Sequence, residues 1–279
     1  MNDRQLTCLV TGATSGLGEA IAAGLVSHGT HVFAVARNAK RGDTALARLQ
    51  DRVPGGQIDM LAADLSVLSE VRTLAEQVKD RCPRLEVLIL NAGVARPCRE
   101  LTVDGLEVDF ATNHLAPFLL TNLLSDLLLA SAPARVVVVS SSGHRHIKTI
   151  NFDALPTGTD FHHLRTYSTT KLLNILFTTE LSHRLGGTGV TANAADPGFV
   201  RTALGRDAQG AFAVFLKIMR PFQLSPEKAA VTPKHLAISP EVAGISGAYF
   251  ANCRATAPST LAQDRAAAQR LWELSTQLI

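Results

Sequence analysis

The stretch Tyr-Ser-Thr-Thr-Lys at residues 167–171 places a phenol and an ammonium group four positions apart. In an α-helix, residues i and i+4 lie one above the other about 5–6 Å apart, so Tyr167 and Lys171 can share one site. A nearby cation favours the phenolate form of tyrosine and draws its pKa down from about 10 toward neutrality. The pair is therefore a candidate for acid–base catalysis, although two solvated side chains on one helix face have the same spacing.

A second candidate is the glycine-rich stretch TGATSGLG at residues 11–18, which separates an apolar run from a helical pattern. Its three glycines suit a tight turn, the close approach of a pyrophosphate, and the packing of a helix against a strand. The helix that follows presents free N–H groups to an anion. The stretch predicts a dinucleotide site, with a plain strand-to-helix turn as the alternative.

The elements that must position these residues alternate along the chain. Short apolar runs typical of strands buried on both faces lie at residues 7–11, 31–36, 58–64, 85–90, 135–140, 190–195 and 247–250. Helical patterns lie between them at residues 18–27, 68–81, 113–130, 167–185 and 226–238. This order predicts an α/β fold with a Rossmann-type, doubly wound parallel sheet of about seven strands flanked by helices. No Pro-rich or Ser-rich linker divides the chain, so residues 1–279 are predicted to form a single domain.

Composition excludes several classes of protein. The chain is 46% hydrophobic and 18% charged with a net charge of +3 and no basic run, which argues against disorder and against a nucleic-acid partner. Its four cysteines form no CxxC pair, and the histidines at 144, 146, 162 and 163 lack helical ligand spacing, so no metal site is expected. No apolar run reaches the length of a membrane span, and no signal-peptide pattern opens the chain. These features predict a cytoplasmic protein.

The glycine spacing GxxxGxG, followed far along the chain by Tyr167 and Lys171, resembles the short-chain dehydrogenase/reductase family. Further matches follow in the family's order: Asp-Leu at 64–65, Asn-Ala-Gly at 91–93, NHLAPF with Asn113, the serines at 140–142, and DPGFVRT at 196–202. The resemblance runs from about Leu6 to about Phe250 and is strongest to the branch of retinol dehydrogenases and related light-dependent reductases. The chain departs from the family in having Leu90 before Asn91 and Asp196 before Pro197, where family members often have Asn and His.

The resemblance implies an oxidoreductase that interconverts a carbonyl and an alcohol. Tyr167 would be the general acid or base, its pKa drawn toward neutrality by Lys171 and the oxidised nicotinamide together. Lys171 would also bind the nicotinamide ribose. Ser141 would orient the carbonyl oxygen, with Ser142 as the alternative, and Asn113 would kink its helix and hold a water in the relay to Lys171. The implied cofactor contacts are Gly12, Thr14, Ser15, Gly16, Leu17, Gly18, Arg37, Asp64, Leu65, Asn91, Ala92, Gly93, Tyr167, Lys171, Pro197, Gly198, Val200 and Thr202.

The end of the second strand predicts which cofactor is used. NAD enzymes of this layout usually place an acidic residue there to bind the ribose hydroxyls. This chain has Ala36 followed by Arg37, and a guanidinium can pair with a 2′-phosphate that a carboxylate would repel. The sequence therefore predicts NADP(H), with a solvent-facing Arg37 as the alternative.

Residues 205–224 are predicted to form a lid over a bulky lipophilic substrate, because the irregular stretch AFAVFLKIMRPF follows the DPGFVRT motif. Core packing and a membrane-contacting patch are the alternatives. The expected partner is a small-molecule carbonyl or alcohol, and the apolar helices bearing Asn113 and Tyr167 are compatible with a homodimer or homotetramer. Two other functions share some of these residues: a sugar-nucleotide epimerase or dehydratase, and a non-catalytic dinucleotide-binding regulator.

Overall fold

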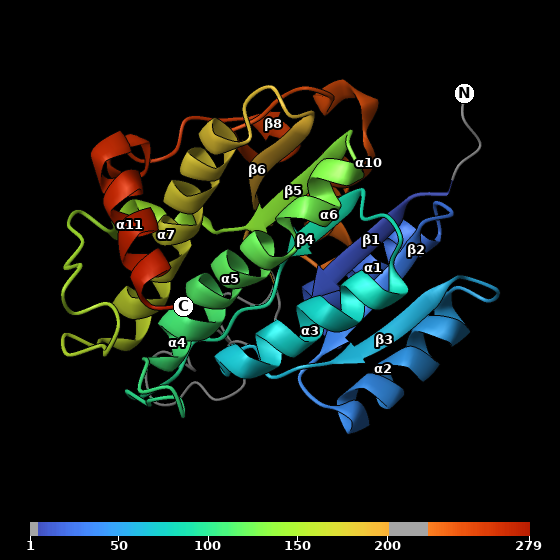
Figure 1. The fold of residues 1–279 in the computed structure, drawn as a ribbon, viewed down its shortest axis with the longest axis horizontal. Coiled ribbons are helices and arrows are strands. Elements are labelled where there is room, and N and C mark those ends of the chain that lie inside the picture. Colours follow the sequence, from blue (N-terminus) through green and yellow to red (C-terminus); the bar gives the residue numbers. More distant parts are fainter. Residues whose placement is uncertain (1–4, 201–222) are drawn as a thin grey trace.

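A single twisted sheet of eight strands forms the centre of the molecule in the computed structural model, which describes residues 5–200 and 223–279 (Figure 1). The strand order is β3-β2-β1-β4-β5-β6-β7-β8. Every neighbouring pair is parallel except β7 and β8, which are antiparallel. The strands are β1 (Thr7–Thr11), β2 (His31–Ala36), β3 (Ile58–Ala62), β4 (Val87–Leu90), β5 (Ala134–Val139), β6 (Val190–Asp196), β7 (Tyr249–Ala251) and β8 (Arg254–Ala255). The doubly wound parallel sheet is thus confirmed, and β8 is the strand that was not predicted.

Helices cover both faces of this sheet. One face packs against α1 (Gly16–Val26), α2 (Ala39–Arg52), α9 (Pro226–Ala229) and α10 (Val231–Ile238). The other packs against α3 (Leu68–Arg81), α5 (Ala116–Leu123), α6 (Ser125–Ala130) and α7 (His163–Arg184). Since side chains alternate across a strand, β1 supplies Leu9 to one core and Cys8 and Val10 to the other. This explains why the strands are apolar at nearly every position.

The predicted helix over residues 113–130 is interrupted in the structure. It begins with the short α4 (Val108–Phe110), continues as a π-helical turn, η1 (Ala111–Leu115), and then divides into α5 and α6. The predicted helix at residues 226–238 likewise divides into α9 and α10. None of the helices in the described part of the chain is long and apolar enough to cross a bilayer.

The C-terminal helix α11 (Arg265–Gln277) lies along the outer side of α7 (Figure 1). The ring of Trp272 lies 4.8 Å from that of Phe118 on α5 and 6.0 Å from that of Phe177 on α7, measured between centroids. The Arg184 guanidinium covers the Trp272 ring at 4.3 Å. Because α11 already occupies this side of α5 and α7, any pairing of two copies through these helices has to use the remaining surface.

Candidate active site

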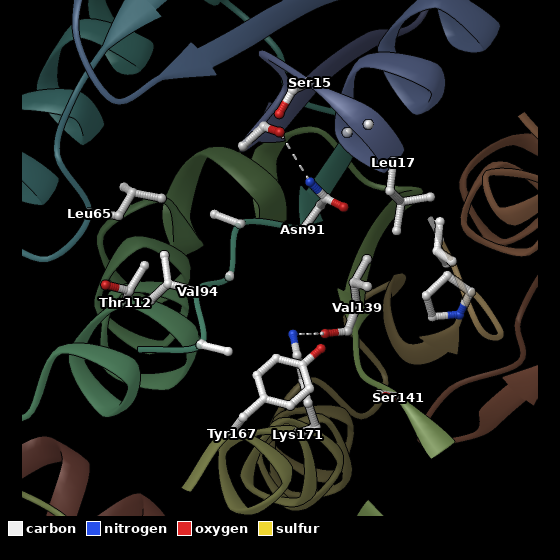
Figure 2. Close-up of a pocket in the computed structure, with 18 of the residues that line it drawn as sticks. Ser15, Leu17, Leu65, Asn91, Val94, Thr112, Val139, Ser141, Tyr167 and Lys171 are labelled. Atoms are coloured by element: carbon white, nitrogen blue, oxygen red, sulfur yellow. Dashed lines mark hydrogen bonds between the residues drawn. The ribbon is translucent and has the colours of Figure 1, made fainter. Parts of the chain in front are cut away.

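The carboxyl ends of the parallel strands open into one cleft of about 1660 Å³. The chain leaves β1 on one side and β4 on the other, and this reversal point is where doubly wound sheets bind ligands. The predicted residues that line the cleft are Gly12, Thr14, Ser15, Gly16, Leu17, Gly18, Arg37, Asp64, Leu65, Asn91, Ala92, Gly93, Ser141, Ser142, Tyr167, Lys171, Pro197, Gly198 and Val200. In Figure 2 the glycine loop, marked by Ser15 and Leu17, faces Tyr167 and Lys171 across this space.

Two glycines of the loop, Gly12 and Gly18, lie where close contacts leave no room for a side chain. Gly12 has a φ of +67°, and a Cβ there would lie 2.8 Å from the Cα of Ala92. A Cβ on Gly18 would collide with the Gly12 carbonyl oxygen. Gly16 has a φ of +55°, but a Cβ there would meet only open space. The backbone at the start of α1 is therefore accessible from the cleft, and the loop fits the pyrophosphate of a dinucleotide.

Asn91 ties the end of β4 to this loop. Its side-chain amide donates to the backbone oxygen of Thr11 at 2.9 Å. It also donates to that of Gly12 at 3.3 Å (Figure 2). In return, Thr11 Oγ1 accepts from the backbone N–H groups of Asn91 at 2.9 Å and Ala92 at 3.1 Å. These bonds fix the carboxyl ends of β1 and β4 relative to each other.

At the end of the cleft beside β2 and β3, the Arg37 side chain follows β2 and is 39% exposed. Its Nε lies 3.9 Å from Asp64 Oδ2, while Asp64 Oδ1 accepts from the backbone and hydroxyl of Ser66. Lys40 and Arg41, in the first turn of α2, line the same end. These two cations were not among the predicted site residues because α2 was not predicted. The residue that could have indicated the start of α2 is Asn38, whose side chain caps the helix by accepting from Arg41 N at 3.0 Å.

Tyr167 and Lys171 lie one turn apart on α7, as their spacing predicts. Lys171 Nζ lies 5.6 Å from the centroid of the Tyr167 ring and donates to the Val139 carbonyl at 3.1 Å (Figure 2). The lysine side chain is almost fully buried, whereas Tyr167 keeps part of its surface in the cleft. The bond to Val139 fixes the ammonium beside the end of β5.

Burial shifts the pKa values of both members of the pair. Burial lowers the pKa of Lys171 to about 8, and the negative charge of Asp109 offsets part of this effect. Burial raises the pKa of the Tyr167 hydroxyl above its ordinary value, and the charges of Asp196 and Asp109 raise it further. In the protein groups alone, desolvation dominates, and the lowering of the tyrosine pKa expected from Lys171 and an oxidised nicotinamide together stays a prediction. The Tyr167 phenol is held in its protonated form.

Asn113 lies in the π-helical turn η1 and is fully buried beneath the cleft. Its Oδ1 accepts from Val94 N at 2.7 Å, and its Nδ2 donates to Val94 O at 2.8 Å and to Thr170 Oγ1 at 3.0 Å. A Cβ on Gly93 would lie 3.3 Å from Lys171 Nζ and 3.5 Å from Asn113 Oδ1. Asn113 and Lys171 thus border one narrow space beside Gly93. π-helical turns are frequent at functional sites.

The three serines after β5 have different surroundings. Ser140 is buried, and its hydroxyl donates to the Lys171 carbonyl at 2.7 Å. Ser141 is half-buried in the cleft wall, where its Oγ accepts from Gly143 N at 3.2 Å, and Ser142 is exposed. The arrangement favours Ser141 over Ser142 as the hydroxyl that meets a substrate.

His144 supports Ser141 from beneath. It is fully buried, with Nδ1 2.7 Å from the Ser141 carbonyl and Nε2 accepting from Ser259 N at 3.1 Å. Because Nε2 accepts, Nδ1 carries the proton and donates to Ser141, and burial lowers the pKa of this imidazole. Within residues 5–200 and 223–279, no group of three His, Cys, Asp or Glu side chains is placed to hold a metal ion.

The turn after β6 borders the cleft through Pro197 and Gly198. Asp196, which stands where family members often have His, is buried. It accepts from the Tyr249 hydroxyl at 2.7 Å and from Gly198 N at 2.9 Å and thereby fixes this turn. Val200 pairs with Leu224 in an isolated bridge. Thr202 and residues 205–222 of the predicted lid lie outside the described residues.

Comparisons with known proteins agree with this geometry. The family model described as short chain dehydrogenase matches residues 6–211. Retinol dehydrogenase 14 of Homo sapiens is 40% identical over an alignment covering 98% of this chain and 86% of that protein. An uncharacterized protein from Mycobacterium paratuberculosis has a solved structure with a TM-score of 0.78 and 32% identity, covering 98% of this chain and 93% of that one. The active-site complex of Pseudomonas aeruginosa RhlG with NADP has a TM-score of 0.70 and 25% identity, covering 88% and 93%.

Proposed function

Because the chain belongs to the short-chain dehydrogenase family and to its retinol-dehydrogenase-like branch, we propose that it interconverts a bulky lipophilic carbonyl compound and its alcohol with NADP(H). The family assignment makes the chain an oxidoreductase that acts on carbonyl and CH–OH groups. The cofactor preference, the lipophilic substrate and the roles of individual residues belong to the proposal. We further propose that the chain works as one NAD(P)-binding domain, and its cytoplasmic location stays a prediction.

The observation that carries the proposal is the position of Tyr167 and Lys171 opposite the glycine loop, in one cleft. A bound nicotinamide would supply the hydride for reduction and accept it in the reverse reaction. Tyr167 gives its proton to the carbonyl oxygen, because its raised pKa keeps the phenol protonated until negative charge develops beside it. Ser141 donates a hydrogen bond that orients the same oxygen.

Lys171 has two roles in this proposal. Its ammonium stabilises negative charge that develops on the Tyr167 oxygen, and it also hydrogen-bonds the nicotinamide ribose. Asn113 hydrogen-bonds the backbone of Val94 and the hydroxyl of Thr170, the residue before Lys171 on α7. We propose that a water beside Gly93 connects Asn113 with Lys171 and returns the proton to the site.

Arg37 supports the choice of NADP(H). It follows β2 directly, no carboxylate occupies the place where NAD enzymes usually have one, and its contact with Asp64 at 3.9 Å is too long for a hydrogen bond. Lys40 and Arg41 add positive charge at the start of α2. The 2′-phosphate of NADP(H) is an anion that this cluster would bind, and an NADP complex of RhlG lies among the structural relatives.

Replacing Arg37 with alanine is expected to weaken NADPH binding by at least about tenfold and NADH binding by less than about threefold, since a charged hydrogen bond is lost only with the phosphate. Dissociation constants for both cofactors, measured by titration calorimetry, test this. Arg52→Ala is the matched control, because it removes another exposed guanidinium, from the last turn of α2, that pairs with Glu227 outside the cleft. Equal losses for both cofactors would contradict the role of Arg37.

Apolar side chains at the nicotinamide end of the cleft support a lipophilic substrate. Leu164 and Phe199 line this end and are large hydrophobic residues left 45% and 42% exposed. Val94 and Ile147 add further apolar surface. Covering such surface stabilises a complex by roughly 25 cal/mol per Å² removed from water, which favours ring or chain substrates over small polar ones.

A panel of aldehydes and ketones of increasing size, assayed by the loss of NADPH absorbance, tests the proposed function. We expect turnover that rises with the apolar size of the substrate. Tight NADPH binding without turnover of any carbonyl or alcohol would instead favour a dinucleotide-binding regulator. The panel thereby also separates the two classes of function that share the glycine loop.

A further inference from the structure

The substrate end of the cleft is cationic. The two guanidinium groups of Arg96 and Arg165 line it. Among the described residues that line the cleft, the only carboxylates are those of Glu19 and Asp64, which belong to the glycine loop helix and the end of the cleft beside β2 and β3. The apolar surface of the substrate end is therefore bordered by positive charge that no lining carboxylate balances.

Arg96 is the most firmly placed of these cations. Its backbone N–H donates to both oxygens of the buried Asp109 carboxylate, at 3.0 and 3.3 Å. Its carbonyl lies 2.6 Å from Nδ1 of His163, one helical turn before Tyr167 on α7. The backbone of Arg96 is thus held between Asp109 on α4 and His163, the first residue of α7.

The guanidinium of Arg96 is incompletely paired by the protein. Its Nε is buried and has no hydrogen-bond partner within the described part of the chain, and the nearest carboxylate, Glu100, lies 3.6 Å away. Arg165, further out, is 3.9 Å from Asp160. Both distances leave the planar N–H groups of the guanidinium able to bind another anion, because neither contact is a short bidentate pair.

We infer that the substrate carries a carboxylate that pairs with Arg96, so that this site handles amphiphilic oxo acids or hydroxy acids rather than neutral lipids. The inference rests on the proposed function and specifies its substrate class. Two coplanar carboxylate oxygens match the donor fork of arginine. Leu164 and Phe199 at the same end would cover the apolar body of such a molecule while Ser141 and Tyr167 meet its carbonyl oxygen.

Matched substrates test the inference: oxo-fatty acids of several chain lengths and the methyl ester of each, assayed with NADPH. For the wild-type enzyme we expect kcat/KM to be at least about tenfold higher for an acid than for its ester. Arg96→Gln should reduce this ratio by about tenfold, mainly by raising KM for the acid, and Arg96→Lys should keep part of it. Arg99→Gln is the control, because it removes a charge from the same loop outside the cleft.

An acid-to-ester ratio near one in the wild type, or a ratio that survives Arg96→Gln, would overturn the inference. Turnover of the esters alone would also overturn it, but would leave the proposed oxidoreductase function standing. Failure of every acid, every ester and every neutral carbonyl would overturn both. The two claims therefore fail by different results.

Discussion

Tyr167→Phe is expected to lower kcat for carbonyl reduction by at least about a hundredfold while changing the dissociation constant of NADPH by less than about threefold. The substitution removes only the proposed proton donor. The Tyr167 hydroxyl makes no hydrogen bond to the described residues, so its loss leaves no buried partner unpaired. Steady-state kinetics and a fluorescence titration with NADPH measure the two quantities. Near-normal turnover in the variant would contradict the assignment.

The second tyrosine of the chain provides the control. Tyr249→Phe also removes a phenol hydroxyl, but one that donates to Asp196 in a buried contact outside the cleft. We expect this variant to lose stability by about 1–2 kcal/mol, because the buried carboxylate loses a partner. Its turnover should fall far less than that of Tyr167→Phe. Comparable losses in both variants would show that the effect is structural.

Lys171→Ala is expected to impair both proton transfer by Tyr167 and binding of the nicotinamide ribose, the two steps in which the ammonium is proposed to act. We expect kcat/KM to fall about a thousandfold and the NADPH dissociation constant to rise at least about tenfold, since a charged donor is lost from both. Thermal unfolding of the variant shows whether its fold is intact. An unchanged cofactor affinity would contradict the ribose contact, whatever the effect on turnover.

The pH dependence of the wild type tests the same residue. Lys171 is protonated below its lowered pKa of about 8 and loses its charge as the pH rises through that value. Tyr167 stays protonated over the same range because its pKa is raised. We therefore expect reduction to be fastest below pH 8 and to decline above it. A profile that keeps rising beyond this pH would contradict a role for the Lys171 cation.

Much of the fold follows from local sequence patterns. Strands β1 and β2 and helix α3 occupy the predicted ranges, because strands buried on both faces are apolar at consecutive positions and α3 has one clear apolar face. Helix α2 was not predicted, because its buried residues are only Gly42, Ala45 and Leu49 and a single large apolar side chain, Leu49, marks its buried face. Helix α11 was also not predicted, although Asp264 caps it by accepting from Ala267 N and its buried residues recur at helical spacing. The contacts of Trp272 with Phe118 and Phe177, which fix its place on α5 and α7, form only in the folded protein.

The sequence predicted which residues line the cleft better than it predicted their acid–base properties. Motifs placed Asn91, Tyr167 and Lys171 correctly at the cleft, because strand ends of a parallel sheet meet at one edge. The raised pKa of Tyr167 depends on burial, and its secondary causes, Asp109 and Asp196, come from distant parts of the chain. Burial and charges that come from residues distant in the sequence cannot be inferred from the spacing of two residues on one helix. The π-helical turn at Asn113 also depends on bonds to Val94 that form only in the folded protein.

Transfer of deuterium tests the central claim, reduction of a carbonyl with NADPH, most directly. NADPH carrying deuterium at both hydrogen positions of the reactive nicotinamide carbon would be incubated with the protein and the best carbonyl of the panel, and the product analysed by mass spectrometry. We expect an alcohol that carries one deuterium on its carbinol carbon, formed at least about a hundredfold more slowly by Tyr167→Phe. An unlabelled alcohol, or no alcohol from any carbonyl despite bound NADPH, would contradict it.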